Sequence, residues 1–226
     1  MNLYKDNDKY FIEFYKDKDE WRINRSKGIG GSDASALVEM NPYKTLIDLW
    51  KDKEYGSPEI TNPAIEYGNT CENLIRELYK AKHLTQEVQY IPDAILTSKR
   101  ISWMRYSPDG LIYDPILGKG ILEIKTMHLQ NMKMLAQWDN GVPNHYYIQT
   151  LHGLLVTEFD FVVFCAELRW KKESEVDGFE QWESKIIERV YTRQEALEDL
   201  KILENKEKEN WKYFENHEMP PLSFQL

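Results

Sequence analysis

The sequence predicts an α/β fold in which a mixed β-sheet is flanked by helices, and three observations support this prediction. The chain of 226 residues is long enough for one sizeable hydrophobic core. Helical patterns come first, followed by a run of short strands, a helix pair, two further strands and a last helix. The segment 159–168 is almost continuously β-branched and aromatic, which indicates an interior strand. This order favours a mixed sheet with helices packed around it.

The composition indicates a packed, reduced protein. Apolar residues make up 42% of the chain, which has seven tryptophans and fourteen tyrosines. No apolar run approaches the ~20 residues of a membrane span, and the first residues lack the apolar centre of a signal peptide. Cys71 and Cys165 lie far apart in the sequence, so both are expected to be reduced in a cytosolic protein without a membrane partner.

The net charge of −9 weighs against a general nucleic-acid coat protein, which would be basic. It does not exclude a nuclease, because a metal site needs local acids and one basic stripe can hold DNA on an acidic surface. Local basic clusters occur at 22–27 and 99–105, and the alternative for each is an ordinary solvated surface.

The helices are predicted from apolar spacing and from capping residues. Residues 4–24 have the spacing of an amphipathic helix whose stripe includes Tyr10 and Trp21. Ser32 with Asp33 offers N-cap chemistry, and Thr192 with Glu195 forms a capping box. The expected helices are 4–24, 32–40, 45–53, 63–84, 129–138, 144–156 and 192–216.

The strands are predicted from alternation and from turn residues between them. Residues 114–118 form a hairpin turn before 119–126, the most apolar strand of this run and therefore a central one. The chain has no repeat and no linker, so a single domain over 1–226 is the economical interpretation. The expected strands are 87–91, 101–106, 110–113, 119–126, 159–168 and 182–191.

Two acids and a lysine form the most informative pattern. Asp109 follows Ser-Pro at the start of one strand, and Glu123 and Lys125 alternate along the next strand. Because side chains two residues apart share a face, Glu123 and Lys125 project together, and Asp109 lies near them if the strands are neighbours. Paired carboxylates are hard ligands suited to Mg²⁺ or Mn²⁺, and a lysine beside such a metal can orient or deprotonate water. This combination predicts metal-assisted phosphodiester hydrolysis.

Each of these residues also has a simpler interpretation. Glu123 and Lys125 could face solvent on a half-buried strand, but charged groups in a core strand need partners or a metal. Glu72, one turn after Gly68 in the helix 63–84, could be an ordinary exposed acid. Gly68 itself weakens a helix by ~1 kcal/mol, and its plausible benefit is close backbone approach.

A glycine-rich turn precedes the helix at Ser32. Gly30 and Gly31 allow backbone to approach a phosphate, the helix start favours an anion, and Arg25 can offer a bidentate fork to it. The alternative is a plain loop-to-helix turn.

Several blocks together resemble the YqaJ-like phage recombinase nucleases, whose best-known relative is lambda exonuclease. The resemblance covers about residues 20–165, while 1–19 and 170–226 have no motif that can be assigned. The matching blocks, in the order of the family, are Trp21-x-x-x-Arg25, Ile29-Gly-Gly-Ser-Asp-Ala34, Asn41-Pro-Tyr-Lys-Thr45, Leu49-Trp50, Gly68-x-x-x-Glu72, Ser107-Pro-Asp-Gly110, Leu122-Glu-Ile-Lys125, Tyr146-x-x-Gln149 and Val156-Thr157.

The resemblance implies a PD-(D/E)XK restriction-endonuclease-like core and roles for individual residues. Asp109, Glu123 and the backbone carbonyl of Ile124 match metal ligands, and Lys125 matches the lysine that positions or activates the attacking water. One departure concerns a second glutamine of many relatives, which is replaced here by Leu151, followed by His152; we interpret His152 as a packing residue rather than a ligand. The remaining matches are Glu72, an acid supporting metal-bound waters; Gln149 and Tyr146, an active-site glutamine motif; and Arg25 and Ser32, which bind a terminal 5′-phosphate.

The implied activity is that of an exonuclease that uses one or two Mg²⁺ ions, or Mn²⁺, and digests the 5′-ended strand of linear duplex DNA. Family members act with a phage single-strand annealing protein, and many form rings, often trimers. A phage or prophage protein in the cytoplasm of a bacterial host is the matching context. Two other hypotheses are an endonuclease with the same core and a DNA-binding module that has lost activity.

Overall fold

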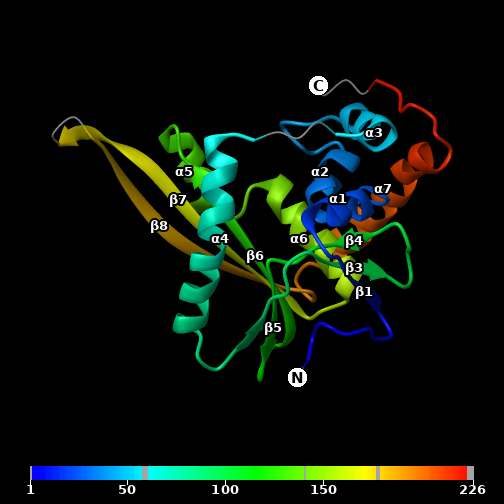
Figure 1. Ribbon diagram of the computed structural model, residues 1–226, viewed down its shortest axis with the longest axis horizontal. Helices are drawn as coiled ribbons and strands as arrows, with labels where there is room; N and C mark the ends of the chain where they lie inside the picture. The colour runs from blue at the N-terminus through cyan, green and yellow to red at the C-terminus, as the bar shows by residue number, and fades with distance from the viewer. Residues whose placement is uncertain (1, 58–60, 140, 177–178, 223–226) are drawn as a thin grey trace.

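A computed structural model describes residues 2–57, 61–139, 141–176 and 179–222 of the chain. Its centre is a five-stranded sheet in the order β2-β5-β6-β7-β8 (Figure 1). β6 and β7 are parallel and the other neighbours are antiparallel, so the sheet is mixed as expected. The strands of this sheet are β2 (Glu87–Gln89), β5 (Gly110–Asp114), β6 (Gly118–His128), β7 (Phe161–Val176) and β8 (Phe179–Thr192).

Helices cover both faces of this sheet. On one face lies α4 (Pro63–Lys82), whose buried Ile75 and Tyr79 pack against Leu122 and other apolar residues of β5, β6 and β7. The other face is covered by α5 (Met132–Asp139) and α6 (Asn144–Thr157), which form the crossover between the parallel strands β6 and β7. Alternate residues of β6 and β7 therefore enter different clusters, one on the face covered by α4 and two on the face covered by α5 and α6.

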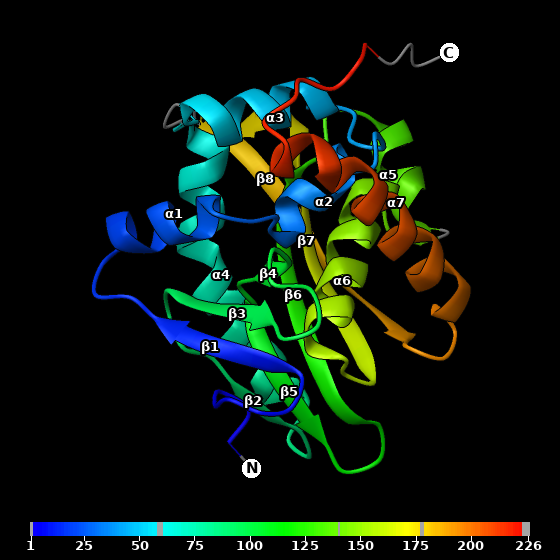
Figure 2. The ribbon, with the colours of Figure 1, turned by 90° about the vertical axis from the view of Figure 1, so that its right-hand side faces the viewer.

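A further layer lies beyond α6. It contains α2 (Gly31–Leu37), α3 (Leu46–Tyr55) and α7 (Leu197–Glu215), which share a cluster around Trp50 and Phe214. Beside α6 lies a second, three-stranded sheet made of β1 (Tyr10–Phe14), β3 (Ala94–Ser98) and β4 (Arg105–Tyr106), as Figure 2 shows. This small sheet joins the same core as α6 through Tyr10, Leu96 and Tyr106.

The predicted helix 4–24 is wrong in its first half. Residues Tyr10–Phe14 form β1, which pairs with β3, and the helix α1 covers only Lys18–Ser26 after an N-cap at Asp17. The aromatic stripe misled the prediction because its members do not face one side. Tyr10 is 1% exposed, whereas Phe11 and Phe14 are each about half exposed.

The structure differs from the predicted elements at three other places. β3 was missed because all five of its residues are buried, so the segment shows no alternation, and the expected strand 101–106 is reduced to β4. The capping bonds between Thr192 and Glu195 do form, but they close a turn, and α7 begins only at Leu197. Within the described ranges, no helix combines the length and apolar character that crossing a membrane requires.

Candidate active site

Asp109 and Glu123 meet at one edge of the central sheet. β5 and β6 are antiparallel neighbours, and Gly110 pairs with Leu122, so the preceding residue Asp109 comes beside Glu123. The Asp109 side chain accepts a hydrogen bond from the Ile124 amide at 2.7 Å, which fixes the carboxylate against β6. Asp109 is half-buried, and Glu123 is only 1% exposed. The structure thus places two carboxylates together in a site largely shielded from water.

Three donors from different elements converge on the carboxylate of Glu123. Lys125 donates from β6 at 2.6 Å, and Tyr106 donates its hydroxyl from β4 at 2.5 Å. Gln149 of α6 donates its side-chain amide to the same oxygen as Lys125. A buried carboxylate needs such partners, so this network accounts for the charge of Glu123 in the interior. Tyr106, which contributes one of the three donors, is a site residue that the sequence pattern did not indicate.

Burial and neighbouring charges shift the pKa values of Asp109 and Lys125. Burial and the nearby Glu123 carboxylate raise the pKa of Asp109 well above its usual value, with Lys125 opposing them. Burial lowers the pKa of the Lys125 ammonium, but the carboxylates of Glu123 and Asp109 outweigh it, so the net shift is upward. The two carboxylates thus favour the charged form of the Lys125 ammonium.

The donor set fits a hard divalent cation. Two neighbouring carboxylates repel each other, and a dication between them relieves that repulsion. The Ile124 amide points to Asp109, and in a strand the carbonyl of the same residue points to the same edge, so this carbonyl is a third oxygen on that side. Among the residues that the structure describes, no group of three or more Asp, Glu, His or Cys side chains could hold a metal. The available ligands are thus two carboxylates and one carbonyl.

Arg76 of α4 is a functional candidate that the sequence analysis missed. Its guanidinium is 2% exposed and donates to the backbone carbonyl of Asp109 at 2.6 Å and to the carboxylate of Glu72. It also stacks on Tyr90, 3.5 Å from the ring centroid. Glu72 is therefore not a free surface acid: it is tied through Arg76 to the Asp109 turn. The available signal was an arginine one helical turn after Glu72, inside an apolar stretch.

Gly68 explains how α4 reaches this site. A Cβ at Gly68 would lie 3.0 Å from the Thr126 hydroxyl oxygen, so glycine permits the close approach of helix and strand that its position suggested. Glu72 and Lys125 line one cavity of about 400 Å³ between α4 and β6. The helix-borne acid and the strand-borne lysine thus face the same space.

Arg25 and Ser32 also lie together at this site. Arg25 donates to the Ser32 hydroxyl at 2.5 Å. Ser32 lies in the first turn of α2 rather than at its N-cap, which is Gly30. A Cβ at Gly31 would lie 3.0 Å from the Tyr106 ring, so this glycine lets α2 pack close to the carboxylate network.

Two cavities meet at Ser32. One, of about 320 Å³, contains Lys125, Gln149 and Tyr146, with the Lys125 nitrogen 5.7 Å from the Tyr146 ring centroid. The other, of about 570 Å³, contains Arg25. Its further charged lining residues are Arg22, Asp33, Lys44, Asp52 and Lys53. Seven of the nine residues predicted for the site therefore line one connected set of cavities. The other two, Asp109 and Glu123, are joined to it by hydrogen bonds with Ile124, Lys125 and Gln149.

His152 has the packing role that was expected of it. It is fully buried, and its Nδ1 lies 2.9 Å from a carboxylate oxygen of Glu207 on α7. Its Nε2 lies near the carbonyls of Ile29 and Arg105, so the ring links α6 to α7 and to the segment before α2. Among the described residues, the hydrogen bonds of its ring nitrogens involve neither Asp109 nor Glu123.

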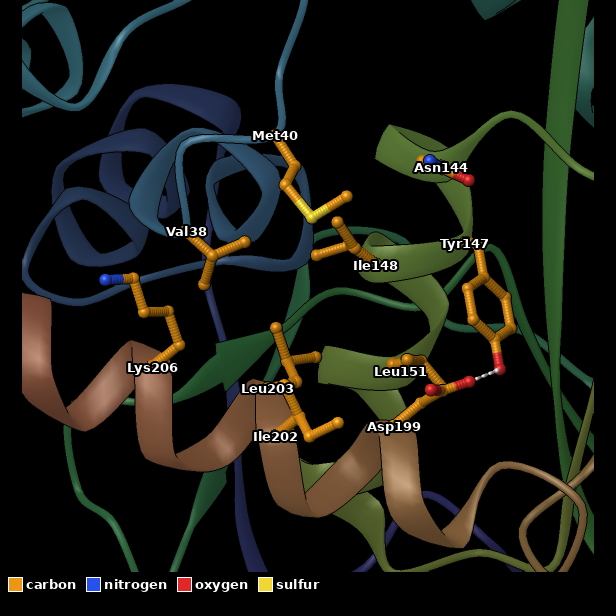
Figure 3. A pocket seen from close by; sticks show the side chains of 10 residues that line it. All are labelled: Val38, Met40, Asn144, Tyr147, Ile148, Leu151, Asp199, Ile202, Leu203 and Lys206. Carbon is orange, nitrogen blue, oxygen red and sulfur yellow. Dashed lines mark hydrogen bonds between the residues drawn. The ribbon is translucent and has the colours of Figure 1, made fainter. Parts of the chain in front are cut away.

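Another cavity, of about 360 Å³, is lined by neither Asp109 nor Glu123. Figure 3 shows it between α6 and α7, with apolar side chains such as Val38, Ile148 and Leu203 converging on it. Tyr147 donates to Asp199 at 2.9 Å across its end. None of the residues predicted for the site lines this cavity.

Comparisons with known proteins agree with this architecture. Residues 20–160 match the YqaJ-like viral recombinase domain. The uncharacterized protein YqaJ of Bacillus subtilis (strain 168) is 33% identical over 156 residues, which cover 66% of this chain but 46% of that protein. The match thus spans about half the length of that relative.

Two crystal structures share the fold. An alkaline exonuclease from Laribacter hongkongensis, LHK-Exo, has a TM-score of 0.60 at 20% identity, covering 88% of this chain and 94% of that one. LHK-Exo in complex with dAMP gives the same TM-score and coverage at 19% identity. These structures confirm the expected mixed sheet flanked by helices. Because the domain match covers more than half of the sequence, this chain belongs to the family of YqaJ-like viral recombinase domains.

Proposed function

We propose that this protein is a Mg²⁺-dependent 5′-to-3′ exonuclease that degrades the 5′-ended strand of linear duplex DNA and leaves 3′ single-stranded tails. The observation that carries this proposal is the placement of Asp109, Glu123 and Lys125 together, with the cavity at Lys125 meeting the cavity of Arg25 at Ser32. Family membership and the exonuclease fold of LHK-Exo support the same chemistry.

Each residue has a defined task in this proposal. Asp109, Glu123 and the Ile124 carbonyl would hold Mg²⁺ or Mn²⁺, and one or two such ions would stabilise charge on the attacking and leaving oxygens. Lys125, fixed by Glu123, orients the attacking water, and Gln149 holds Glu123 in place. Arg76 bonds to the Glu72 carboxylate and to the Asp109 backbone carbonyl, so it holds these two residues in position relative to each other. Glu72 lines the same cavity as Lys125.

The proposed setting follows the family. The substrate is a duplex DNA end, and the 3′ tail would pass to a phage single-strand annealing protein in the cytoplasm of a bacterial host. We further propose assembly into a homo-oligomer, with a trimeric ring as the favoured form.

A time course on two forms of one plasmid tests the activity. We expect the linear duplex to release acid-soluble mononucleotides with Mg²⁺ and to remain intact with a chelator. The covalently closed circle should resist digestion, because the reaction begins at an end. Label at the 5′ end should be released before label at the 3′ end. Cleavage of the closed circle would instead identify an endonuclease, and no metal-dependent release from either form would indicate an inactive DNA-binding module.

The cavity at Arg25 predicts a preference for 5′-phosphorylated ends. Arg25 and Ser32 offer charged and neutral donors to a terminal phosphate, so a 5′-phosphorylated duplex should be degraded faster than its 5′-hydroxyl counterpart. Arg25→Ala should slow degradation of the phosphorylated duplex by roughly 10- to 100-fold, the effect of losing a hydrogen bond to a charged group.

The 5′-hydroxyl duplex is the matched control for this prediction. It lacks the phosphate, so Arg25→Ala should change its initial rate little. Equal initial rates for the wild-type protein on the two duplexes would contradict the assignment of this cavity to a terminal phosphate.

A further inference from the structure

Arg169 on β7 is held between two aromatic rings. Its guanidinium carbon lies 3.8 Å from the ring centroid of Tyr67 on α4 and 4.2 Å from that of Trp182 on β8. Trp182 is 38% exposed and also contacts His128 at the end of β6, with 4.6 Å between ring centroids. Contact with two aromatic rings restricts the movement of the guanidinium while leaving its N–H groups able to donate.

Among the described residues, the N–H edge of this guanidinium has no hydrogen-bond acceptor. Within the ranges that the structure describes, no carboxylate or carbonyl oxygen accepts a hydrogen bond from the Arg169 side chain, whereas Arg76 and Arg100 both donate to carboxylates. The nearest acid along the strand, Glu167, accepts the Tyr67 hydroxyl at 2.9 Å instead. An ordered guanidinium with its donors unused is suited to an external anion.

A groove connects Arg169 to the proposed catalytic residues. The cavity that contains Arg169 and Trp182, about 290 Å³, shares Ala64 and Thr126 with the cavity that contains Lys125. Because β5 pairs with β6 only as far as Leu122, the last residues of β6 form an open sheet edge under α4. The groove follows this edge.

The order of the cavities gives the groove a direction. On its other side, the cavity with Lys125 shares Ile65 and Asn69 with the cavity that contains Arg25. A strand with its 5′-phosphate near Arg25 and its first phosphodiester near Lys125 would continue toward Arg169. The segment beyond the cleaved bond, on its 3′ side, would therefore reach this arginine.

We propose that Arg169, held between Tyr67 and Trp182, binds a backbone phosphate of the substrate strand on the 3′ side of the scissile bond. The planar guanidinium matches a phosphate, and the exposed part of Trp182 offers a surface for a base or sugar. This inference rests on the proposed function, because the order of the contacts assumes a 5′ end near Arg25. On a chain of net charge −9, such a local cation matters for holding DNA.

The test compares Arg169→Gln with Lys172→Gln. Both remove one positive charge from β7, but Lys172 is paired with Glu183 at 2.6 Å and lies on the opposite face of the strand. On a long 5′-phosphorylated duplex, Arg169→Gln should raise KM about tenfold with kcat nearly unchanged, since it loses a contact made before and during reaction. The slope of log KM against log salt should fall by about one, as expected for one lost phosphate contact. Lys172→Gln should change neither quantity.

Two further measurements separate the outcomes. Trp182→Ala should weaken binding in the same way, and Trp182→Phe should restore most of it, because a ring still covers the guanidinium.

Fluorescence anisotropy with the same labelled duplex in chelator measures binding without cleavage. If the wild-type protein does not degrade DNA, the proposed function fails, yet this measurement still reports on Arg169. Identical affinity and salt slope for Arg169→Gln and Lys172→Gln would overturn the inference.

Discussion

Lys125→Ala is expected to reduce DNA cleavage by about 10²–10⁴-fold, the usual contribution of a group that positions or transfers a proton in the reaction. Asp109→Asn should have at least as large an effect, because it removes the charge of one of the two carboxylates that would hold the metal. Within the described residues, the Lys125 side chain donates a hydrogen bond only to the Glu123 carboxylate. The measurement is the initial rate of mononucleotide release from a linear duplex at saturating Mg²⁺.

Lys119→Ala is the matched control for this pair. Lys119 lies on the same strand as Lys125, at the hairpin end of β6 and away from the carboxylates, so its loss should leave the rate unchanged. Thermal unfolding with and without Mg²⁺ checks that the variants fold. Mg²⁺ should stabilise the wild-type protein, by about 2.7 kcal/mol at a hundredfold excess over Kd, but Asp109→Asn much less. Near wild-type cleavage by Lys125→Ala or Asp109→Asn would refute the assigned roles.

The sheet and the carboxylate pair could be predicted because their signals are local. The turn at 114–118 forces β5 and β6 to be neighbours, and alternation then fixes which side chains share a face. Asp109, Glu123 and Lys125 follow from these two rules alone. The neighbouring groups Gln149 and Arg25 came from the resemblance to a family, since no local rule brings α6 or α1 to this edge.

Arg76 and Tyr106 could not be predicted because their roles depend on long-range packing. Arg76 meets Asp109 because α4 packs against the sheet, and Gly68 permits a close approach of the same helix to β6. Tyr106 meets Glu123 only because β4 belongs to a second sheet, which the sequence did not reveal. The strand β3 of that sheet is buried on both faces and so shows no alternation, and the aromatic residues of β1 have a spacing that suggested an amphipathic helix. Local patterns therefore identify the charged residues of a site but not the groups that hold them.

The second large expected effect is on the stability of the fold, and it depends on the buried pair of His152 and Glu207. Both residues are fully buried, and Nδ1 of His152 faces the carboxylate while Nε2 faces two carbonyls. Every neighbour of the ring nitrogens is an acceptor, so the doubly protonated imidazolium satisfies all of them. Burial lowers the pKa of His152, but the charge and hydrogen bond of Glu207 outweigh it, and the net shift is upward.

His152→Ala is expected to lower the free energy of unfolding by about 3–5 kcal/mol, because it leaves the Glu207 carboxylate buried without its partner. The raised pKa also gives the wild-type protein a pH dependence with a definite sign. The folded state holds the proton more tightly than the unfolded state, whose histidine pKa is about 6.5. The stabilisation is therefore complete below about pH 6.5 and is lost as the pH rises through the folded-state pKa.

Glu207→Gln is the variant that isolates this dependence. An amide at position 207 can still donate to a neutral His152, so the fold should lose less stability than with His152→Ala, while the charge pair disappears. Urea unfolding at a series of pH values above 6.5 should show the wild-type protein losing stability relative to Glu207→Gln. Parallel pH profiles for the two proteins would mean that His152 is neutral in the folded state. The link between α6, which holds Gln149, and α7 would then rest on a hydrogen bond from a neutral imidazole rather than on an ion pair.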